Sequence, residues 1–160
     1  MVAVYLTKQN KQYTVSNCTT DDIDTHFEHV KDLIGDMPVE EYKTRMSTSI
    51  AEDLAYKVML DDICCGFLYV KKLGRGGEGV SIWGNNSIGF TVLLKEMFEA
   101  LPFHKVVVEP HTTDIKYIKS LATGTSIRNH HTAGAPLALH VPTLLEKFKG
   151  MYIKLGITKL

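Results

Sequence analysis

The chain of 160 residues carries 18 Lys and Arg against 18 Asp and Glu, so its formal net charge at pH 7 is zero. This balance excludes the broad basic surface typical of nucleic-acid-binding proteins. No apolar run approaches the roughly 18 residues that a membrane-spanning helix needs. A chain of this length can bury a sizeable core, and we expect one domain over residues 1–160.

The three cysteines, Cys18, Cys64 and Cys65, do not form a disulfide framework, because their number is odd and two are adjacent. The N-terminal segment is too polar, and its apolar part too short, for a signal peptide. Both features predict free thiols and a cytoplasmic protein. Cys64 and Cys65 are neighbours in a predicted strand, so we expect them to face opposite sides of the sheet.

The first third of the chain predicts one strand followed by two helices. The strand is formed either by residues 2–6 or by residues 13–15, and the second segment is favoured as the core strand. Thr19 and Asp22 have capping-box spacing at the start of a first helix. A second helix is expected over residues 38–55, because its leading proline suits a first helical turn.

A hairpin is expected next, with strands at 56–60 and 63–71 joined by the pair Asp61 and Asp62. The second of these strands is almost continuously apolar. Such a run is typical of a central strand that is covered on both faces.

Residues 79–121 predict a strand–helix–strand–helix unit around which the rest of the chain is arranged. Its strands, at 80–83 and 105–109, are joined by a long helix, so we expect them to lie parallel with a right-handed crossover. Ser87 is expected to cap that helix and Pro102 to end it. The apolar stripe of the helix consists of Ile88, Val92, Leu93, Met97, Phe98 and Leu101.

The last part of the chain predicts a helix at 114–121, a hairpin of strands at 126–130 and 137–141, and a final helix over 143–155 that Gly156 ends. The final helix either covers the sheet or makes a homodimer contact. The whole pattern predicts a mixed α/β (α+β) fold, a mostly antiparallel sheet with helices on both faces.

This order of elements, over about residues 13–141, resembles the GCN5-related N-acetyltransferase (GNAT) superfamily. Residues 109–121 are similar to the family's strand end and the helix after it. His111 stands where the family usually has Asn. Ile118 stands at the position of the family's thiolate-protonating Tyr, with Tyr117 one place earlier.

The resemblance implies acetyl-CoA as the cofactor. In the family, an Arg/Gln-x-x-Gly-x-Gly/Ala loop receives the pyrophosphate at a helix N-terminus, where unpaired N–H groups favour an anion. Here residues 84–89 keep two glycines and small polar side chains but lack the leading Arg or Gln, as in short GNAT-like proteins of bacteriophages. A plain strand–helix connection is the alternative. The expected cofactor-binding residues are Ile82, Trp83 and Gly84 for the pantetheine arm, and Asn85, Asn86 and Ser87 for the phosphates.

The same resemblance implies catalytic residues for acetyl transfer to an amine, which needs a base and an acid. Glu109 and His111, at the carboxyl end of a strand, are the two candidate bases, and Tyr117 is the candidate acid. A solvated carboxylate and a residue at a helix entry are the structural alternatives for the two bases.

No metal site is expected. His130 and His131 are adjacent in a predicted strand and point to opposite faces, so they do not reach one ion easily. The glycine-rich residues 74–79 precede a strand rather than a helix, which is not the setting of a phosphate-binding loop.

Two functions remain open at this stage. The chain is either an acyl-CoA-dependent N-acyltransferase that acts on an amine of a small molecule or protein, or a GNAT-like scaffold without catalysis that binds a protein partner. If the likeness to phage proteins holds, the partner is a host protein in the host cytoplasm.

Overall fold

The computed structural model describes residues 2–32, 34–72, 78–101, 105–111 and 137–160, and a mixed sheet runs through them. Its strands are β1 (Val2–Leu6), β2 (Gln12–Asn17), β3 (Ala55–Leu60), β4 (Ile63–Lys72), β5 (Glu78–Gly84), β6 (Lys105–His111), β7 (Leu137–His140) and β8 (Thr158–Lys159). Their order in the sheet is β7-β6-β5-β4-β3-β2-β1-β8. All neighbours are antiparallel except β5 and β6, which confirms the predicted mostly antiparallel sheet.

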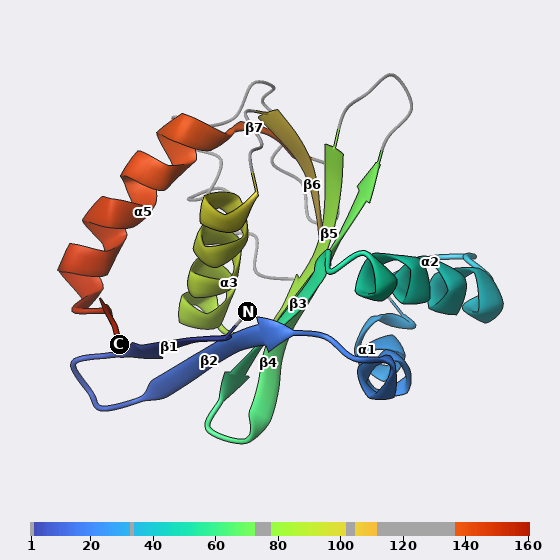
Figure 1. Cartoon of the computed structure of the whole chain (residues 1–160), viewed down its shortest axis with the longest axis horizontal. Helices are drawn as coiled ribbons and strands as arrows, with labels where there is room; N and C mark the ends of the chain where they lie inside the picture. The colour runs from blue at the N-terminus through green and yellow to red at the C-terminus, as the bar shows by residue number, and fades with distance from the viewer. Residues whose placement is uncertain (1, 33, 73–77, 102–104, 112–136) are drawn as a thin grey trace.

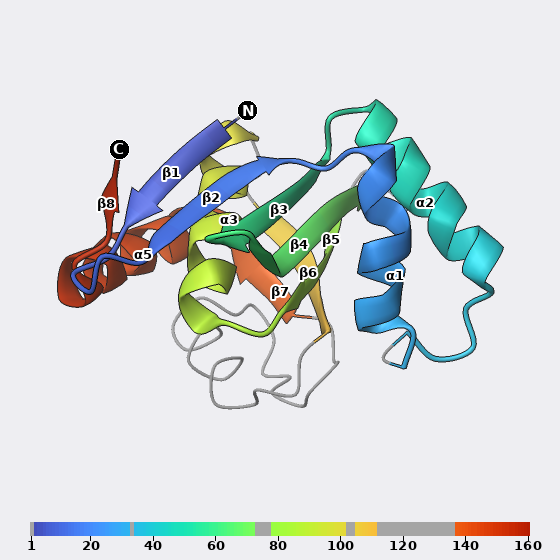
Figure 2. The same ribbon diagram turned by 90° about the horizontal axis from the view of Figure 1, so that it is seen from below.

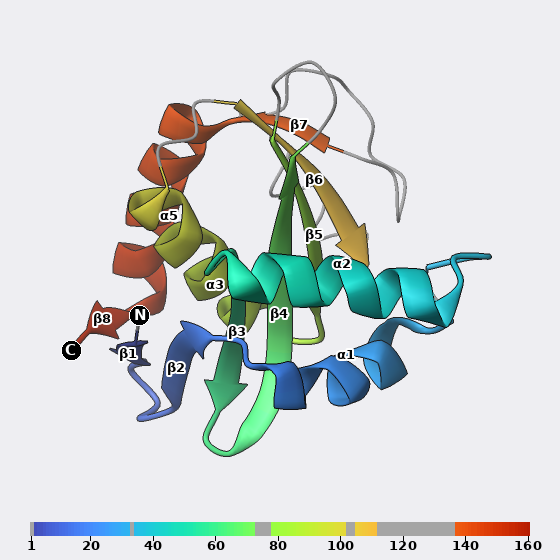
Figure 3. The same cartoon turned by 45° about the vertical axis from the view of Figure 1, so that its right-hand side comes forward.

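Helices cover both faces of this sheet, as predicted (Figure 1). They are α1 (Ile23–Val30), entered through the short 3-10 turn η1 (Thr20–Asp22), then α2 (Val39–Ala51), α3 (Ser87–Ala100) and α5 (Val141–Leu155). Helix α3 lies between the sheet and α5, whereas α1 and α2 lie side by side over the opposite face (Figure 3). None of the described helices combines the length and apolarity that crossing a bilayer requires.

Two clusters of buried apolar side chains follow from this layering. The cluster between the sheet, α3 and α5, which we call the α3-side core, includes Val58, Ile82, Leu93, Val108 and Phe148. Because α3 is covered by the sheet on one side and α5 on the other, it buries more than the single predicted stripe.

The second cluster, which we call the α1-side core, lies under α1 and α2 and includes Ile23, Tyr42, Met46, Phe67 and Trp83. Successive residues of β4 alternate between the two cores, so this strand is covered on both faces as its apolar run predicted.

A bulge interrupts the alternation at the start of β4. The pairing of β3 with β4 shifts between Val58 and Met59, so that Val58 lies opposite Gly66 and Met59 opposite Cys64. The extra residue, Cys65, points into the α3-side core, whereas Cys64 packs against the α1-side core. The expectation that the two thiols face opposite sides is confirmed.

The crossover from β5 through α3 to β6 is parallel, as predicted, with pairs from Gly79 and Val107 to Trp83 and His111. The expected N-cap is wrong by one residue. Asn86, not Ser87, caps α3, because its extended backbone lets its side-chain oxygen accept a hydrogen bond from Gly89.

The N-terminal third differs from the prediction in two respects. Both candidate first strands form, and they pair with each other as the hairpin of β1 and β2. Helix α2 ends at Ala51 instead of residue 55, because the chain turns at Asp53, whose φ is 57°, and Ala55 already begins β3. The Thr19 N–H does donate to the Asp22 carboxylate, over 2.7 Å, as the capping box requires.

At the C-terminus, α5 is followed by Gly156 at a φ of 64°, the left-handed conformation expected of its stop. The chain then adds β8, which was not predicted and which pairs with the end of β1, so that the first and last strands lie side by side (Figure 2). The predicted helix at 114–121 and the predicted strand at 126–130 lie outside the described residues.

Candidate functional site

Strand β5 is an interior strand of the sheet and is paired on both sides near its end. Ile82 pairs with Leu68 on one side and Pro110 on the other, and its side chain is buried in the α3-side core. Trp83 pairs with Phe67 and with the final residue of β6. Within the described residues the parallel strands therefore stay paired to the end of β6, and no opening between them begins at Ile82 or Trp83.

The turn after β5 is packed tightly against its surroundings. A Cβ added to Gly84 would lie 2.7 Å from Cδ2 of Phe90, and one added to Gly89 would lie 2.7 Å from Sγ of Cys65. Both glycines are therefore required by the close approach of α3 to the strands. This packing requirement accounts for them without any role in phosphate binding.

Hydrogen bonds also hold this turn. The Asn86 side-chain oxygen accepts from the Gly89 N–H over 3.0 Å and from the Tyr13 hydroxyl over 3.1 Å. The Asn85 N–H donates to the carbonyl of Cys65 over 3.1 Å. The first N–H donors of α3 are thus partly used by the protein itself.

Two backbone N–H groups at the start of α3 are not used as donors within the described residues. Among the residues that the structure describes, no acceptor is bound to the N–H of Ser87 or Ile88. The side chains of Asn85 and Ser87 are exposed beside them. Unpaired donors at a helix N-terminus favour an anion, and phosphate binding by this turn stays a prediction.

The candidate catalytic residues lie on or beyond β6. By backbone pairing, Glu109 lies opposite Ser81 and His111 opposite Trp83, one strand away from the turn. The side chains of Glu109 and His111, and the whole of Tyr117, lie outside the described residues. Their catalytic roles remain predictions.

An aromatic stack covers the sheet face beside Trp83. The ring centroids of Trp83 and Phe67 are 5.4 Å apart, His29 stacks on Trp83 at 4.1 Å, and His26 stacks on Phe67 at 3.8 Å. With the rings of His29 and Phe67 beside it and 8% of its surface exposed, Trp83 is a core anchor under α1.

A cluster missed in the sequence stands at the start of α1. Cys18, Asp22 and His26 bring one potential metal-ligating atom each to within 4.8 Å of one another. Their regular spacing of four residues is the signal that could have revealed them, since residues four apart share one helix face.

The charges of this cluster are set by burial and by Lys57. Burial lowers the pKa of His26 to about 4 and raises the pKa of the Cys18 thiol well above its usual range. Burial alone would raise the pKa of Asp22. Hydrogen bonds from Lys57 and from the Thr19 N–H outweigh burial, so the net shift of the Asp22 pKa is downward.

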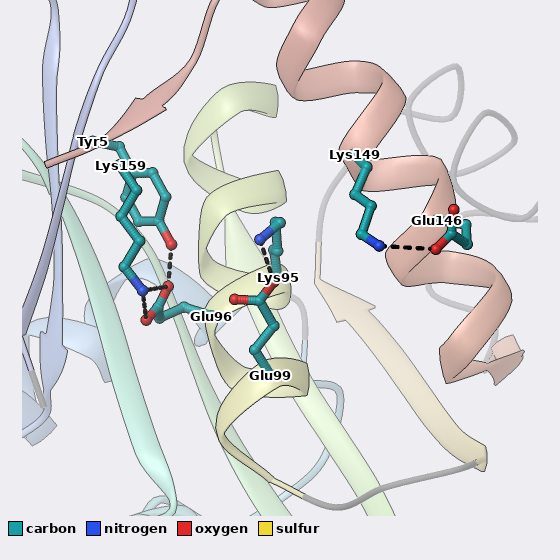
Figure 4. Close-up of polar contacts among 7 residues, drawn as sticks. All are labelled: Tyr5, Lys95, Glu96, Glu99, Glu146, Lys149 and Lys159. Atoms are coloured by element: carbon teal, nitrogen blue, oxygen red, sulfur yellow. Dashed lines mark hydrogen bonds and ion pairs between the residues drawn. The ribbon is translucent and has the colours of Figure 1, made fainter.

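On the opposite face, a buried carboxylate joins three elements (Figure 4). Glu96 of α3 accepts a hydrogen bond from the Tyr5 hydroxyl of β1. It also binds Lys159 of β8, whose Nζ lies 2.8 and 3.2 Å from its two oxygens. Burial, and then the bond to Glu96, raises the pKa of Tyr5. This network has a structural role, since it fixes both terminal strands to α3.

One pocket, of about 320 Å³, lies between α2 and the second half of β4. Its lining residues are Thr44, Arg45, Thr48, Ser49, Glu52, Tyr69, Val70 and Lys71. Val70 pairs with Val80 near the start of β5, so this pocket lies at the far end of β5 from the turn at Gly84.

No protein-family model matches the sequence, and none of the curated proteins matches it. Solved structures do match. An uncharacterized protein from Bacillus halodurans has a TM-score of 0.63 at 11% identity, covering 96% of this chain and 97% of that one. A GNAT-family acetyltransferase from Bacillus cereus has a TM-score of 0.57 at 17% identity, covering 80% and 95%.

Mycobacterium smegmatis RimJ, solved in complex with CoA-disulfide, has a TM-score of 0.56 at 12% identity, covering 94% of this chain and 93% of that one. At such identities the likeness concerns the fold. The chain therefore has a GNAT-like fold, as its sequence of elements predicted.

Proposed function

We propose that the chain is an acyl-CoA-dependent N-acyltransferase that transfers an acetyl group to an amine of a small molecule or a protein. The observation that carries this proposal is the start of α3. It follows β5 after a short turn, beside parallel β6, and the N–H groups of Ser87 and Ile88 are without acceptors in the described structure. Such a helix end fits the pyrophosphate of CoA. The CoA-disulfide in the RimJ structure, a protein of similar fold, supports the same choice of ligand.

The chemistry needs few groups from this chain. The amine attacks the thioester carbonyl, an amide C–N bond forms and the C–S bond breaks. A base takes a proton from the ammonium form to give the attacking amine, and an acid gives a proton to the departing thiolate. We assign the base to Glu109 or His111 and the acid to Tyr117. The backbone position of the first two on β6, one strand from Ile82 and Trp83, is compatible with this role.

A scaffold without catalysis that binds a protein partner is the second candidate. Two observations favour it: the Asn86 side chain occupies the Gly89 N–H, and β5 and β6 stay paired to the last residue of β6. If a phage encodes the chain, a host protein is the expected partner.

Calorimetry and thermal unfolding with acetyl-CoA and free CoA separate the two candidates. A ligand that binds only the folded chain stabilises it by about 2.7 kcal/mol at 100 times its dissociation constant. We expect binding by the unmodified chain and its loss in Ser87→Glu. A glutamate at the first position of α3 favours the helix but repels phosphate, so this loss would not reflect unfolding.

Ser47→Glu is the matched control, because Ser47 is exposed on α2, on the opposite face of the sheet. It should bind CoA as the unmodified chain does. If millimolar CoA produces no heat of binding and no thermal shift, the transferase proposal is contradicted. Capture of a protein partner is then the next experiment.

A further inference from the structure

We propose that Cys18, Asp22 and His26 form a binding site for a divalent transition metal of the zinc class, on the α1 side of the sheet. The three ligating atoms lie within 4.8 Å of one another, and thiolate sulfur, carboxylate oxygen and imidazole nitrogen are the ligands that Zn²⁺ takes in proteins. This site is independent of the acyltransferase proposal.

Three consecutive elements build the site. Cys18 follows β2, and its N–H is bound to the carbonyl of Ala55 over 2.9 Å, which fixes it beside β3. Asp22 ends the turn η1 and His26 lies one helical turn further on, in α1. The local geometry of the chain therefore holds the three side chains together without any bound ion.

Two of the three side chains are also held in orientation. The His26 ring stacks on Phe67 with an interplanar angle of 2°, which fixes the plane of the imidazole. Oδ2 of Asp22 accepts the Thr19 N–H over 2.7 Å. Ordered partners of this kind are what orient the ligands of metal sites.

His26 supplies the second observation that points to a ligand. The residue is 1% exposed, and its Nδ1 has no hydrogen-bond partner in the described part of the structure. Buried polar atoms nearly always have a partner, so a missing ion is a direct explanation of this one.

A cation already neutralises this cluster. Nζ of Lys57 lies 2.8 Å from Oδ1 and 3.0 Å from Oδ2 of Asp22. The Lys57 side chain is 22% exposed, so it can turn toward solvent and leave Oδ1 open to a metal. On binding, the S–H bond of Cys18 breaks, a sulfur–metal bond forms and the proton passes to solvent. The thiolate and the carboxylate then balance the two charges of the ion, and three protein ligands leave a fourth position for water.

Titration of the full chain with Co²⁺ tests the site, because a thiolate–cobalt bond gives a charge-transfer absorption, and Zn²⁺ should displace the cobalt. We expect the absorption in the unmodified chain and its loss in Cys18→Ser. We expect Lys57→Met to bind Co²⁺ roughly tenfold more tightly, because it removes the competing ammonium. Cys65→Ala is the matched control. It removes a thiol on the opposite face and should leave the absorption unchanged.

The gain of affinity in Lys57→Met does not depend on how well a ligand variant folds. Absence of the absorption in both the unmodified chain and Lys57→Met would overturn the proposal. Its persistence in Cys18→Ser would overturn it too, since another thiol would then be the ligand. Equal Co²⁺ affinities in the unmodified chain and Lys57→Met would mean that Asp22 is not a ligand, which contradicts the proposal.

Discussion

His26 shows how one buried side chain can control the response of this fold to pH. Burial against Phe67 lowers its pKa from 6.5 to about 4. Of the charged groups around it, Asp22 raises this pKa, whereas Lys57 and His29 lower it. The folded chain therefore keeps His26 neutral in a range where the unfolded chain protonates it.

This shift predicts a loss of stability in mild acid. Between pH 6.5 and about 4 the unfolded chain binds more protons than the folded one, so the free energy of unfolding falls as the pH falls through that window. The contribution is fully present above pH 6.5, and its loss across the window amounts to about 3 kcal/mol. Urea unfolding with a metal chelator, at about pH 7 and about pH 4, measures it.

His26→Phe is the control for this prediction, because a phenyl ring can stack on Phe67 but does not titrate. It should lose most of the pH dependence above pH 4. Asp22 contributes in a lower window, below its ordinary value of 3.8, because its folded pKa is depressed. An unchanged slope in His26→Phe would assign the effect to other groups.

The residues of the candidate site were predictable only where local rules decide them. The turn after β5 and the helix behind it follow from the strand and helix patterns of the sequence. The choice of Asn86 over Ser87 as the cap does not, because Tyr13, 73 residues away in the chain, also donates to the Asn86 side chain. Likewise, the position of His26 over Phe67 depends on how α1 packs on the sheet.

The first turn of α3 packs closely against the bulge of β4. A Cβ at Gly89 would meet Sγ of Cys65 at 2.7 Å, closer than van der Waals contact permits. Gly89→Ala should therefore destabilise the fold by about 1–3 kcal/mol through overpacking, even though alanine is the better helix former. Chemical denaturation measures this loss.

The same change should have the opposite effect once Cys65 is replaced. In a Cys65→Ala background the sulfur is gone, and Gly89→Ala should be neutral or stabilise by up to about 1 kcal/mol through helix propensity. The double-mutant cycle then gives a coupling energy between the two positions. A cost of Gly89→Ala that is equal in both backgrounds would mean that the sulfur is not what the new methyl group meets.

At the level of elements, the sequence identifies those with strong periodicity and misses those that depend on a partner. The hairpin at Asp61 and Asp62 and the final helix were found because each has its own turn or stop residue. Strand β8 has two residues and exists through its pairing with β1, which no local pattern reveals. The early end of α2 depends on the turn at Asp53, a residue with positive φ but not a glycine.

For the molecule as a whole, α3 is the element that all layers share. It buries apolar residues toward the sheet and toward α5, and its Glu96 binds the strands at both ends of the chain. Its predicted stripe underestimated this burial, because sequence periodicity gives one buried face and does not indicate that a later helix covers the other. The general architecture was nevertheless predictable, since the order of strands and helices restricts the topologies open to the chain.

The role of α5 as the cover of α3 leads to the last prediction. Phe148 of α5 is fully buried in the α3-side core, whereas Ile153, on the same helix, is 81% exposed. Phe148→Ala should lower the free energy of unfolding by about 3–4 kcal/mol, through lost burial and the cavity left behind. Ile153→Ala should change it by less than about 0.5 kcal/mol. Both variants place alanine in α5, so helix propensity does not explain a difference between them. Equal effects in urea denaturation would mean that α5 does not close the core and that α3 is stable without its cover.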